Sequence, residues 1–203
     1  MAREAAAERR RQILDAAVRV FARQGFHSTR VADIADEADV AYGLVYHYFD
    51  SKENVLDELF RQRWSLLIEA IREADRSSER PQEKLGAVAG FIIDSYRYDP
   101  ELMKVVIVEV TRAANSFGQT HLEQIHEAYS LIAKIVSEGQ ASGHFRNDVD
   151  AYFASMTFYG VIEQLLSGWI FGLIPAGDAD FDGARQLVVT TICEGLDAPT
   201  ASR

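Results

Sequence analysis

The most constraining feature of this chain is a pair of short helical patterns, residues 30–38 and 41–48, separated only by a tight turn. Apolar residues within each pattern recur three and four positions apart, which is the period of an amphipathic helix. Ala35 is small enough to let the two helices cross closely, and Val45 is the apolar residue that seats the second helix. The turn needs a positive backbone φ at Asp39, which Asp tolerates less well than Gly. Together these features predict a helix-turn-helix.

The remainder of the chain also follows a helical period, and no stretch alternates between apolar and polar residues as a strand would. Gly25 is expected to end the first helix in a left-handed conformation, and Ser28 or Thr29 is expected to cap the helix that follows. Further helices are predicted over residues 3–24, 51–75, 83–98, 100–114, 120–142, 149–173 and 181–196.

These elements predict an all-α fold with two domains. Residues 1–52 form an N-terminal three-helix helix-turn-helix domain, and residues 53–203 form a C-terminal helical domain for ligand binding and dimerisation. The helix over residues 51–75 reaches roughly 35–40 Å at the rise of an α-helix, which is long enough to join the two domains.

The charge distribution also separates two parts of the chain. The net charge is −10, which by itself argues against nucleic-acid binding. Residues 1–63 hold 10 Lys and Arg against 11 Asp and Glu, whereas residues 64–203 hold 11 against 20. The excess acid therefore lies in the second part, while Arg9, Arg10 and Arg11 cluster in the first. This asymmetry indicates two different tasks, although solvated surface charge is the simpler explanation of each group.

Other classes of protein are disfavoured by what the sequence contains. The single cysteine, Cys193, fits a reducing cytosol, and the charged N-terminus does not resemble a signal peptide, so we expect a cytoplasmic protein. The most apolar stretch, residues 158–174, is interrupted by Glu163, Gln164 and Ser167, which favours a buried helix over a membrane span.

No motif for catalysis is recognisable, because the sequence has no glycine-rich phosphate loop, CxxC, HExxH or GxSxG. The histidines are scattered, and His121 and His126 are five positions apart, which places them poorly on one helical face for a metal. We therefore expect no enzyme, no catalytic residue, no metal and no cofactor.

The run TRVADIADEADVAYGLVYHYFDSKENVLDELF resembles the N-terminal domain of the TetR regulators. Three positions depart from the family pattern: Asp39 replaces a Gly, Ala41 replaces a Ser, and Tyr48 replaces a His. The residues that match the pattern are Thr29, Ile34, Ala35, Ala38, Val40, Gly43, Tyr46, Phe49 and Lys52.

The resemblance implies a transcriptional repressor that binds a double-stranded, palindromic DNA operator as a homodimer. The residues implied to hold phosphates are Thr29, Tyr46, Tyr48 and Lys52. The residues implied to face base edges are Ala41, Tyr42, Gly43, Leu44 and His47, and Arg30 is counted with the DNA-binding set. Aromatic packing is the alternative role for the tyrosines, and solvation at a helix N-terminus is the alternative for Lys52.

The helix predicted over residues 149–173 is apolar on nearly every side, so it must be covered on two faces. One face can pack on its own core and the other on a partner chain. The helix over residues 181–196 is its natural companion, because TetR relatives dimerise through their last two helices.

Several polar side chains lie among apolar residues of the second domain, where a ligand could satisfy them. Ordinary salt bridges are the alternative for each. Together with the aromatic Trp169, the candidate ligand-binding residues are Glu109, Arg112, Tyr129, Tyr159 and Glu163.

A weaker resemblance, carried by VIVEVTRAAN, IVSEGQASGHFRNDVD and YGVIEQLLSGWIF, is to the fatty-acid-degradation subgroup of TetR regulators. It implies a small hydrophobic effector, long-chain acyl-CoA, that releases the repressor from DNA, with Arg112 near the CoA phosphates. The alternative is a drug- or toxin-sensing repressor with a cationic or aromatic effector, which Glu109, Glu163 and Trp169 would suit. An activator or an architectural DNA-binding protein would use the same N-terminal domain.

Overall fold

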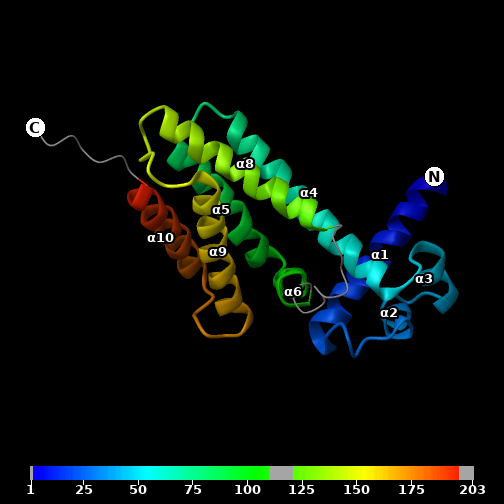
Figure 1. The fold of residues 1–203 in the computed structure, drawn as a ribbon. Coiled ribbons are helices and arrows are strands. Elements are labelled where there is room, and N and C mark those ends of the chain that lie inside the picture. Colours follow the sequence, from blue (N-terminus) through cyan, green and yellow to red (C-terminus); the bar gives the residue numbers. More distant parts are fainter. Residues whose placement is uncertain (1, 110–120, 197–203) are drawn as a thin grey trace, which may run out of the picture. The chain divides into compact units, whose positions relative to one another are not determined.

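The computed structural model describes residues 2–109 and 121–196, with the side chains of residues 2, 3 and 109 left out. Every regular element within these two ranges is a helix, which confirms the predicted all-α class (Figure 1). The chain divides into two compact units. The first comprises Met1–Arg63 and Asp99–Gly118, and the second comprises Trp64–Tyr98 and Gln119–Arg203, so the two units divide within a helix.

The first unit contains the three helices of the predicted helix-turn-helix domain, packed around one apolar core. The large side chains of Ile13, Phe21, Ile34 and Leu56 are fully buried there, and Val45 is 1% exposed. Its elements are α1 (Ala2–Gln24), α2 (Val31–Glu37), α3 (Tyr42–Tyr48), the first part of α4 (Lys52–Arg76), α6 (Pro100–Lys104) and the π-helix η1 (Val105–Glu109).

The two turns that join the first three helices have the predicted backbone geometry. Gly25 ends α1 with a φ of 81°, and Asp39 lies between α2 and α3 with a φ of 51°. The predicted cap of α2 is wrong, however, because Arg30 and not Ser28 or Thr29 occupies the N-cap position. The Thr29 hydroxyl instead donates to the carbonyl oxygen of Gly25 at 2.8 Å.

The single helix predicted over residues 100–114 is also wrong. The α-helix α6 ends at Lys104, and a π-helical turn follows over Val105–Glu109. Three of the four residues from Val105 to Val108 are Val and the fourth is Ile, and all four side chains are buried. A run of β-branched residues has a lowered helix propensity, and a wider turn lets consecutive side chains reach the interior. Residues 110–114 lie outside the described residues.

The second unit is a bundle formed by the remainder of α4 with α5 (Pro81–Tyr98), α8 (Leu122–Ala141), α9 (Ala151–Ile170) and α10 (Asp178–Leu196). Its fully buried side chains include Leu85, Ile92, Ile132, Phe158 and Ile162.

The end of α9 and the start of α10 differ slightly from the prediction. Helix α9 ends three residues early, because Gly172 takes a φ of 66° just after it. Helix α10 begins at Asp178 rather than Phe181, and the Asp180 carboxylate accepts from the backbone N–H of Gly177 at its start. No helix in the described ranges is long and apolar enough to cross a membrane.

Candidate DNA-binding helix and effector site

Helix α3 buries one side and exposes the other. Val45 holds the helix against the core of the first unit, while Tyr42 is 53% exposed and Tyr46 is 43% exposed. Ala41 precedes the helix as its N-cap residue and is exposed, as are Gly43 and His47. The helix packs on the core through its buried side alone, so the aromatic surface on its other side is suited to contact with another molecule.

The two exposed tyrosines form one structural pair. Their hydroxyl oxygens lie 3.1 Å apart in a hydrogen bond, and their rings meet edge to face with centroids 5.1 Å apart. The hydrogen bond with Tyr42 raises the pKa of Tyr46, so the Tyr46 hydroxyl keeps its proton near neutral pH. Tyr46 is therefore both packed against an aromatic ring and exposed. The two tyrosines present their hydroxyl groups to solvent above their apolar rings.

The other predicted contacts on α3 surround this pair. His47 packs its ring on that of Tyr48 at 5.1 Å, and both Leu44 and Tyr48 are half-buried. A Cβ added to Gly43 would meet no atom of the protein within 4 Å. The absence of a side chain at Gly43 is thus not required by the protein's own packing, and it leaves the backbone open to close approach from outside.

Thr29 and Lys52 have roles within the protein. Thr29 is 2% exposed, and its hydroxyl is bonded to Gly25. The Lys52 ammonium donates to the carbonyl oxygens of Phe26 at 2.9 Å, His27 at 3.3 Å and Thr29 at 2.9 Å, and it lies over the Phe26 ring. Because these bonds use all three ammonium hydrogens, Lys52 fixes the α1–α2 loop in this state.

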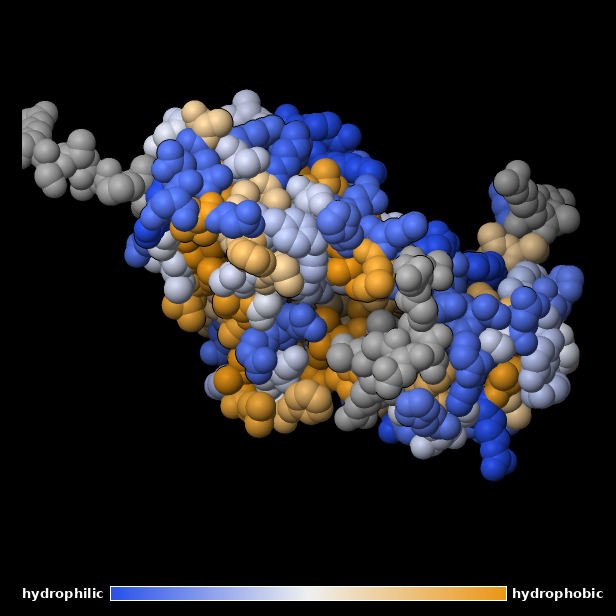
Figure 2. All heavy atoms as spheres, viewed as in Figure 1, coloured by the Kyte–Doolittle hydropathy of each residue, from blue (hydrophilic) through white to orange (hydrophobic). Residues whose placement is uncertain are grey.

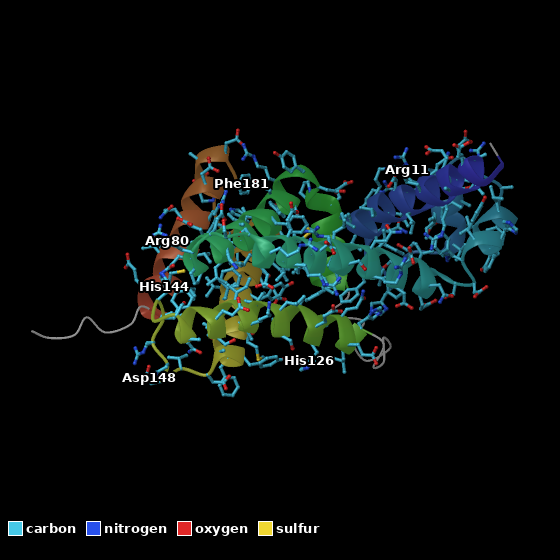
Figure 3. The ribbon with its side chains drawn as sticks, turned by 90° about the horizontal axis from the view of Figure 1, so that it is seen from above. Arg11, Arg80, His126, His144, Asp148 and Phe181 are labelled. Atoms are coloured by element: carbon cyan, nitrogen blue, oxygen red, sulfur yellow. The ribbon has the colours of Figure 1, made fainter. Side chains whose placement is uncertain are left out.

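The arginines of the first unit differ in their availability. Arg30 is exposed beside α2. Arg19 and Arg23 both bind the carboxylate of Glu37, and Arg11, labelled on α1 in Figure 3, binds Glu8 in the same helix. The charges of Arg11, Arg19 and Arg23 are therefore offset by acidic neighbours.

The second unit brings two of the predicted ligand-binding tyrosines together. The ring of Tyr129 on α8 meets that of Tyr159 on α9 at 5.6 Å, and it meets Tyr152 at 6.1 Å. Trp64, in the second part of α4, lies 5.6 Å from Tyr159. We refer to Trp64, Tyr129, Tyr152 and Tyr159 as the α8–α9 aromatic cluster.

Glu163 lies one helical turn after Tyr159 on α9 and adjoins this cluster. Burial raises the pKa of its carboxyl group, and burial together with the charge of Glu163 raises the pKa of Tyr129. Of the residues that the structure describes, none forms a hydrogen bond or an ion pair with Glu163. A partly buried carboxyl group with no partner is a favourable place for a ligand.

Trp169 belongs to a different cluster. Its ring stacks on Tyr96 at 5.6 Å and meets Phe181 at 4.8 Å, and its indole N–H donates to the carbonyl oxygen of Pro175 at 2.8 Å. Figure 3 shows Phe181, beside Trp169, well apart from His126, whose ring adjoins Tyr152. The structure thus does not bring Trp169 into the α8–α9 aromatic cluster.

Two predicted ligand-binding residues cannot be placed, since Arg112 and the side chain of Glu109 lie outside the described residues. Sequence reasoning missed Trp64 and Tyr152. Tyr152 had a usable signal, because it lies seven residues before Tyr159 and therefore on the same face of α9. Trp64 had none, because it reaches the cluster from another helix.

Several large apolar side chains of α9, and Leu187 of α10, are exposed. Phe153 is 70% exposed and Leu187 is 61% exposed, with Met156 and Val161 also exposed nearby in sequence. A Cβ added to Gly160, on the same helix, would meet no atom within 4 Å. Figure 2 shows further hydrophobic atoms at the end of this unit where the α9–α10 loop lies.

Two family models together match most of the chain. Residues 13–59 match the model for bacterial regulatory proteins of the tetR family, and residues 60–174 match the C-terminal region of YsiA-like proteins. The junction between the two matches falls within α4, close to where the compact units divide.

Named relatives agree with these matches. The fatty acid metabolism regulator protein of Bacillus subtilis is 31% identical over 160 residues, covering 78% of this chain and 82% of the relative. The transcriptional repressor KstR2 of Rhodococcus jostii is 27% identical, covering 94% of this chain and 92% of the relative. The structure of FadR from Bacillus subtilis in complex with stearoyl-CoA aligns with a TM-score of 0.81 at 28% identity, covering 91% of this chain and 98% of that one. The chain belongs to the tetR family of bacterial regulatory proteins.

Proposed function

We propose that this protein is a homodimeric repressor that binds a palindromic DNA operator and is released by a long-chain acyl-CoA. The DNA-binding assignment rests on helix α3. Buried Val45 anchors this helix, and its exposed side presents the hydroxyl groups of Tyr42 and Tyr46. Such a helix can enter the major groove, where hydrogen-bonding groups distinguish the base pairs.

The DNA contacts divide into two kinds. Tyr42 and His47 contact base edges together with Ala41, Leu44 and the open backbone of Gly43. The residues that contact the phosphate backbone are Arg30, Tyr46 and Tyr48, with Thr29 and Lys52 holding the α1–α2 loop that supports them. Phosphate contacts orient the protein, and base contacts select the sequence.

The exposed apolar side chains of α9, with Leu187 of α10, support the homodimer. Phe153, Met156 and Leu187 would be costly to leave in water, and the open position at Gly160 lets a helix of a second copy approach closely. A symmetric pair of such faces gives a two-fold dimer, whose two copies of α3 meet half-sites about 34–36 Å apart on a palindromic operator.

The effector assignment is supported by the relatives and by the chemistry of the second unit. One relative is named as a fatty acid metabolism regulator, and one solved neighbour holds stearoyl-CoA. The α8–α9 aromatic cluster offers rings from three helices as an apolar lining for an acyl chain. Because α4 supplies residues to both units, a change in its position on ligand binding would shift the dimer toward a state with misplaced reading helices.

One observation favours a second candidate. Glu163 adjoins electron-rich tyrosine rings and has no ion-pair partner in the described part of the chain. A cationic hydrophobe could satisfy both the carboxylate and the ring faces. This would make the protein a drug- or toxin-sensing repressor with the same DNA-binding helix.

Thermal melting with different compounds tests the effector. Stearoyl-CoA at about 100 times its dissociation constant should stabilise the protein by roughly 2.7 kcal/mol, a rise of about 5–10 °C in Tm for a chain of this size. Free CoA and a hydrophobic quaternary ammonium compound serve as controls. A shift with the ammonium compound alone would contradict the acyl-CoA assignment, and it would leave the DNA-binding role of α3 intact.

A further inference from the structure

Arg9 lies on α1 beside the turn between α2 and α3. Its guanidinium donates to the Gln12 side-chain oxygen at 2.8 Å, and the Gln12 amide nitrogen donates to the carbonyl oxygen of Ala38 at 2.6 Å. Ala38 is the C-cap residue of α2, and Ala41 is the N-cap residue of α3. One glutamine side chain therefore holds the Arg9 guanidinium next to the connection that leads into α3.

The positive charge of Arg9 is not offset by a neighbouring carboxylate. Arg9 is exposed, and within the described residues it forms no ion pair; its hydrogen bond goes to the neutral amide of Gln12. The other α1 arginines whose side chains the structure describes each bind a carboxylate: Arg10 binds Glu58, Arg11 binds Glu8, and Arg19 and Arg23 bind Glu37. Arg9 is thus the arginine on this helix that can meet an external anion without losing an ion pair.

The positions around Arg9 on the helix surface keep its charge accessible. Side chains three and four positions away are neighbours on a helix. For Arg9 these neighbours are Ala5, Ala6, Gln12 and Ile13, and none of them is acidic. The two alanines are exposed and have short side chains, so they leave space beside the guanidinium.

We propose that Arg9 binds a backbone phosphate of the operator at the edge of the groove that α3 enters. In helix-turn-helix proteins the first residues of the reading helix contact base edges, so a group beside the start of that helix meets the phosphates that border the groove. A guanidinium has five N–H donors and Gln12 uses one, which leaves donors for a phosphate. This inference rests on the proposed operator binding, and it adds a contact from outside residues 13–59, which match the family model.

The salt dependence of DNA binding tests the inference in the full-length protein. Anisotropy titrations between about 50 and 200 mM KCl would use an operator that the wild type has selected from random DNA. Each protomer of the dimer supplies one Arg9, so Arg9→Gln should make the slope of log affinity against log salt shallower by about two. Operator and unrelated DNA should lose affinity by the same factor, because a phosphate contact carries no sequence information.

Two further variants distinguish a direct contact from a general effect of charge. Arg9→Lys should keep most of the wild-type slope, because an ammonium group still binds phosphate. Arg11→Gln removes the same charge from a position two residues away, on the opposite side of α1, and should keep the wild-type slope.

Replacing single operator phosphates by neutral methylphosphonates locates the contact. At one position in each half-site the replacement should weaken binding of the wild type, and at that position it should have no effect on Arg9→Gln. If every replacement affects both proteins equally, Arg9 does not bind a phosphate.

The outcomes separate this inference from the proposed function. If Arg9→Gln keeps the wild-type slope, or Arg11→Gln lowers it equally, the phosphate assignment is wrong and DNA binding by α3 stands. If Arg9→Gln weakens binding to the operator but not to unrelated DNA, Arg9 contacts bases and the phosphate assignment is overturned. If the wild type selects no DNA sequence and binds none, both are wrong.

Discussion

The Arg10 guanidinium on α1 donates a hydrogen bond of 3.0 Å to the Glu58 carboxylate on α4, and it lies 4.9 Å above the ring of Phe49. Glu58 also accepts from Arg61 and Gln62 in its own helix, and its side chain is only 11% exposed. One carboxylate therefore connects the first helix of the DNA-binding unit to the helix that follows α3. Arg10, one of the three clustered arginines near the start of the sequence, is held by this interaction.

The first prediction concerns acid stability. Burial alone would raise the pKa of Glu58, but hydrogen bonds from Arg10, Arg61 and Gln62 outweigh it and lower the pKa from 4.5 to about 2. A lowered folded-state pKa stabilises the fold above pH 4.5, and this contribution is lost as the pH falls from 4.5 toward 2. In melting curves measured between neutral pH and pH 3, Glu58→Gln should be less stable than the wild type by about 2 kcal/mol at neutral pH. This loss is smaller than the full pKa shift implies, because the partners of Glu58 are partly exposed to solvent. The difference should shrink in acid, and a constant difference would contradict the assignment.

The second prediction concerns the turn before α3. Asp39 has a φ of 51°, which costs any residue with a Cβ roughly 1 kcal/mol or more relative to glycine. Asp39→Gly should therefore stabilise the protein by up to about 1 kcal/mol, less the entropy that glycine loses on folding. Asp39→Ala, which keeps the strain and loses the polar side chain, should destabilise it. Chemical denaturation of both variants and the wild type measures the order of their stabilities. Equal stabilities of Asp39→Gly and Asp39→Ala would show that the turn is unstrained.

The third prediction concerns the end of α8. A Cβ added to Gly139 would overlap the ring of Phe145, which is 1% exposed, and would lie 3.1 Å from Cβ of Pro81. Gly139→Ala should destabilise the second unit by about 1–3 kcal/mol, although alanine favours helices more than glycine does. Phe145→Leu should restore part of the loss in the double variant. Additive effects in that double-mutant cycle would show that the two positions do not compete for space.

Much of the fold follows from local patterns in the sequence. Gly25 and Asp39 could be assigned their left-handed conformations because a tight connection between helices leaves few alternatives. The break at Lys104 could not be predicted, since residues 100–114 keep a helical period and only the buried Val105–Val108 run distinguishes a π-turn from an α-helix.

The functional residues were predictable to a different degree. The exposed face of α3 follows from helical geometry once Val45 is known to point inward. The separation of Trp169 from Tyr129 and Tyr159 depends on which face of α9 meets α5 and which meets α8, and this is a tertiary property. Likewise, no local signal shows that Lys52 reaches back to three carbonyl oxygens around residue 27.

The fourth prediction concerns the homodimer. Gly160 is exposed in the single chain and lies on the apolar face with Phe153 and Val161. Gly160→Arg should shift the protein from dimer to monomer in sedimentation velocity, because a long charged side chain would separate the two apolar faces. Ser130→Arg, an exposed position on α8, serves as the matched control and should remain dimeric. A dimeric Gly160→Arg variant would place the interface elsewhere.

Anisotropy titration with a fluorescent operator tests whether α3 contacts DNA through Tyr42 and His47. The operator is first selected from random DNA by the wild-type protein. Tyr42→Ala and His47→Ala should each weaken operator binding by about 1–3 kcal/mol, while the sedimentation of the dimer and the melting shift with ligand stay as in the wild type. Unchanged operator affinity in both variants would contradict the assignment of α3 as the DNA-reading helix.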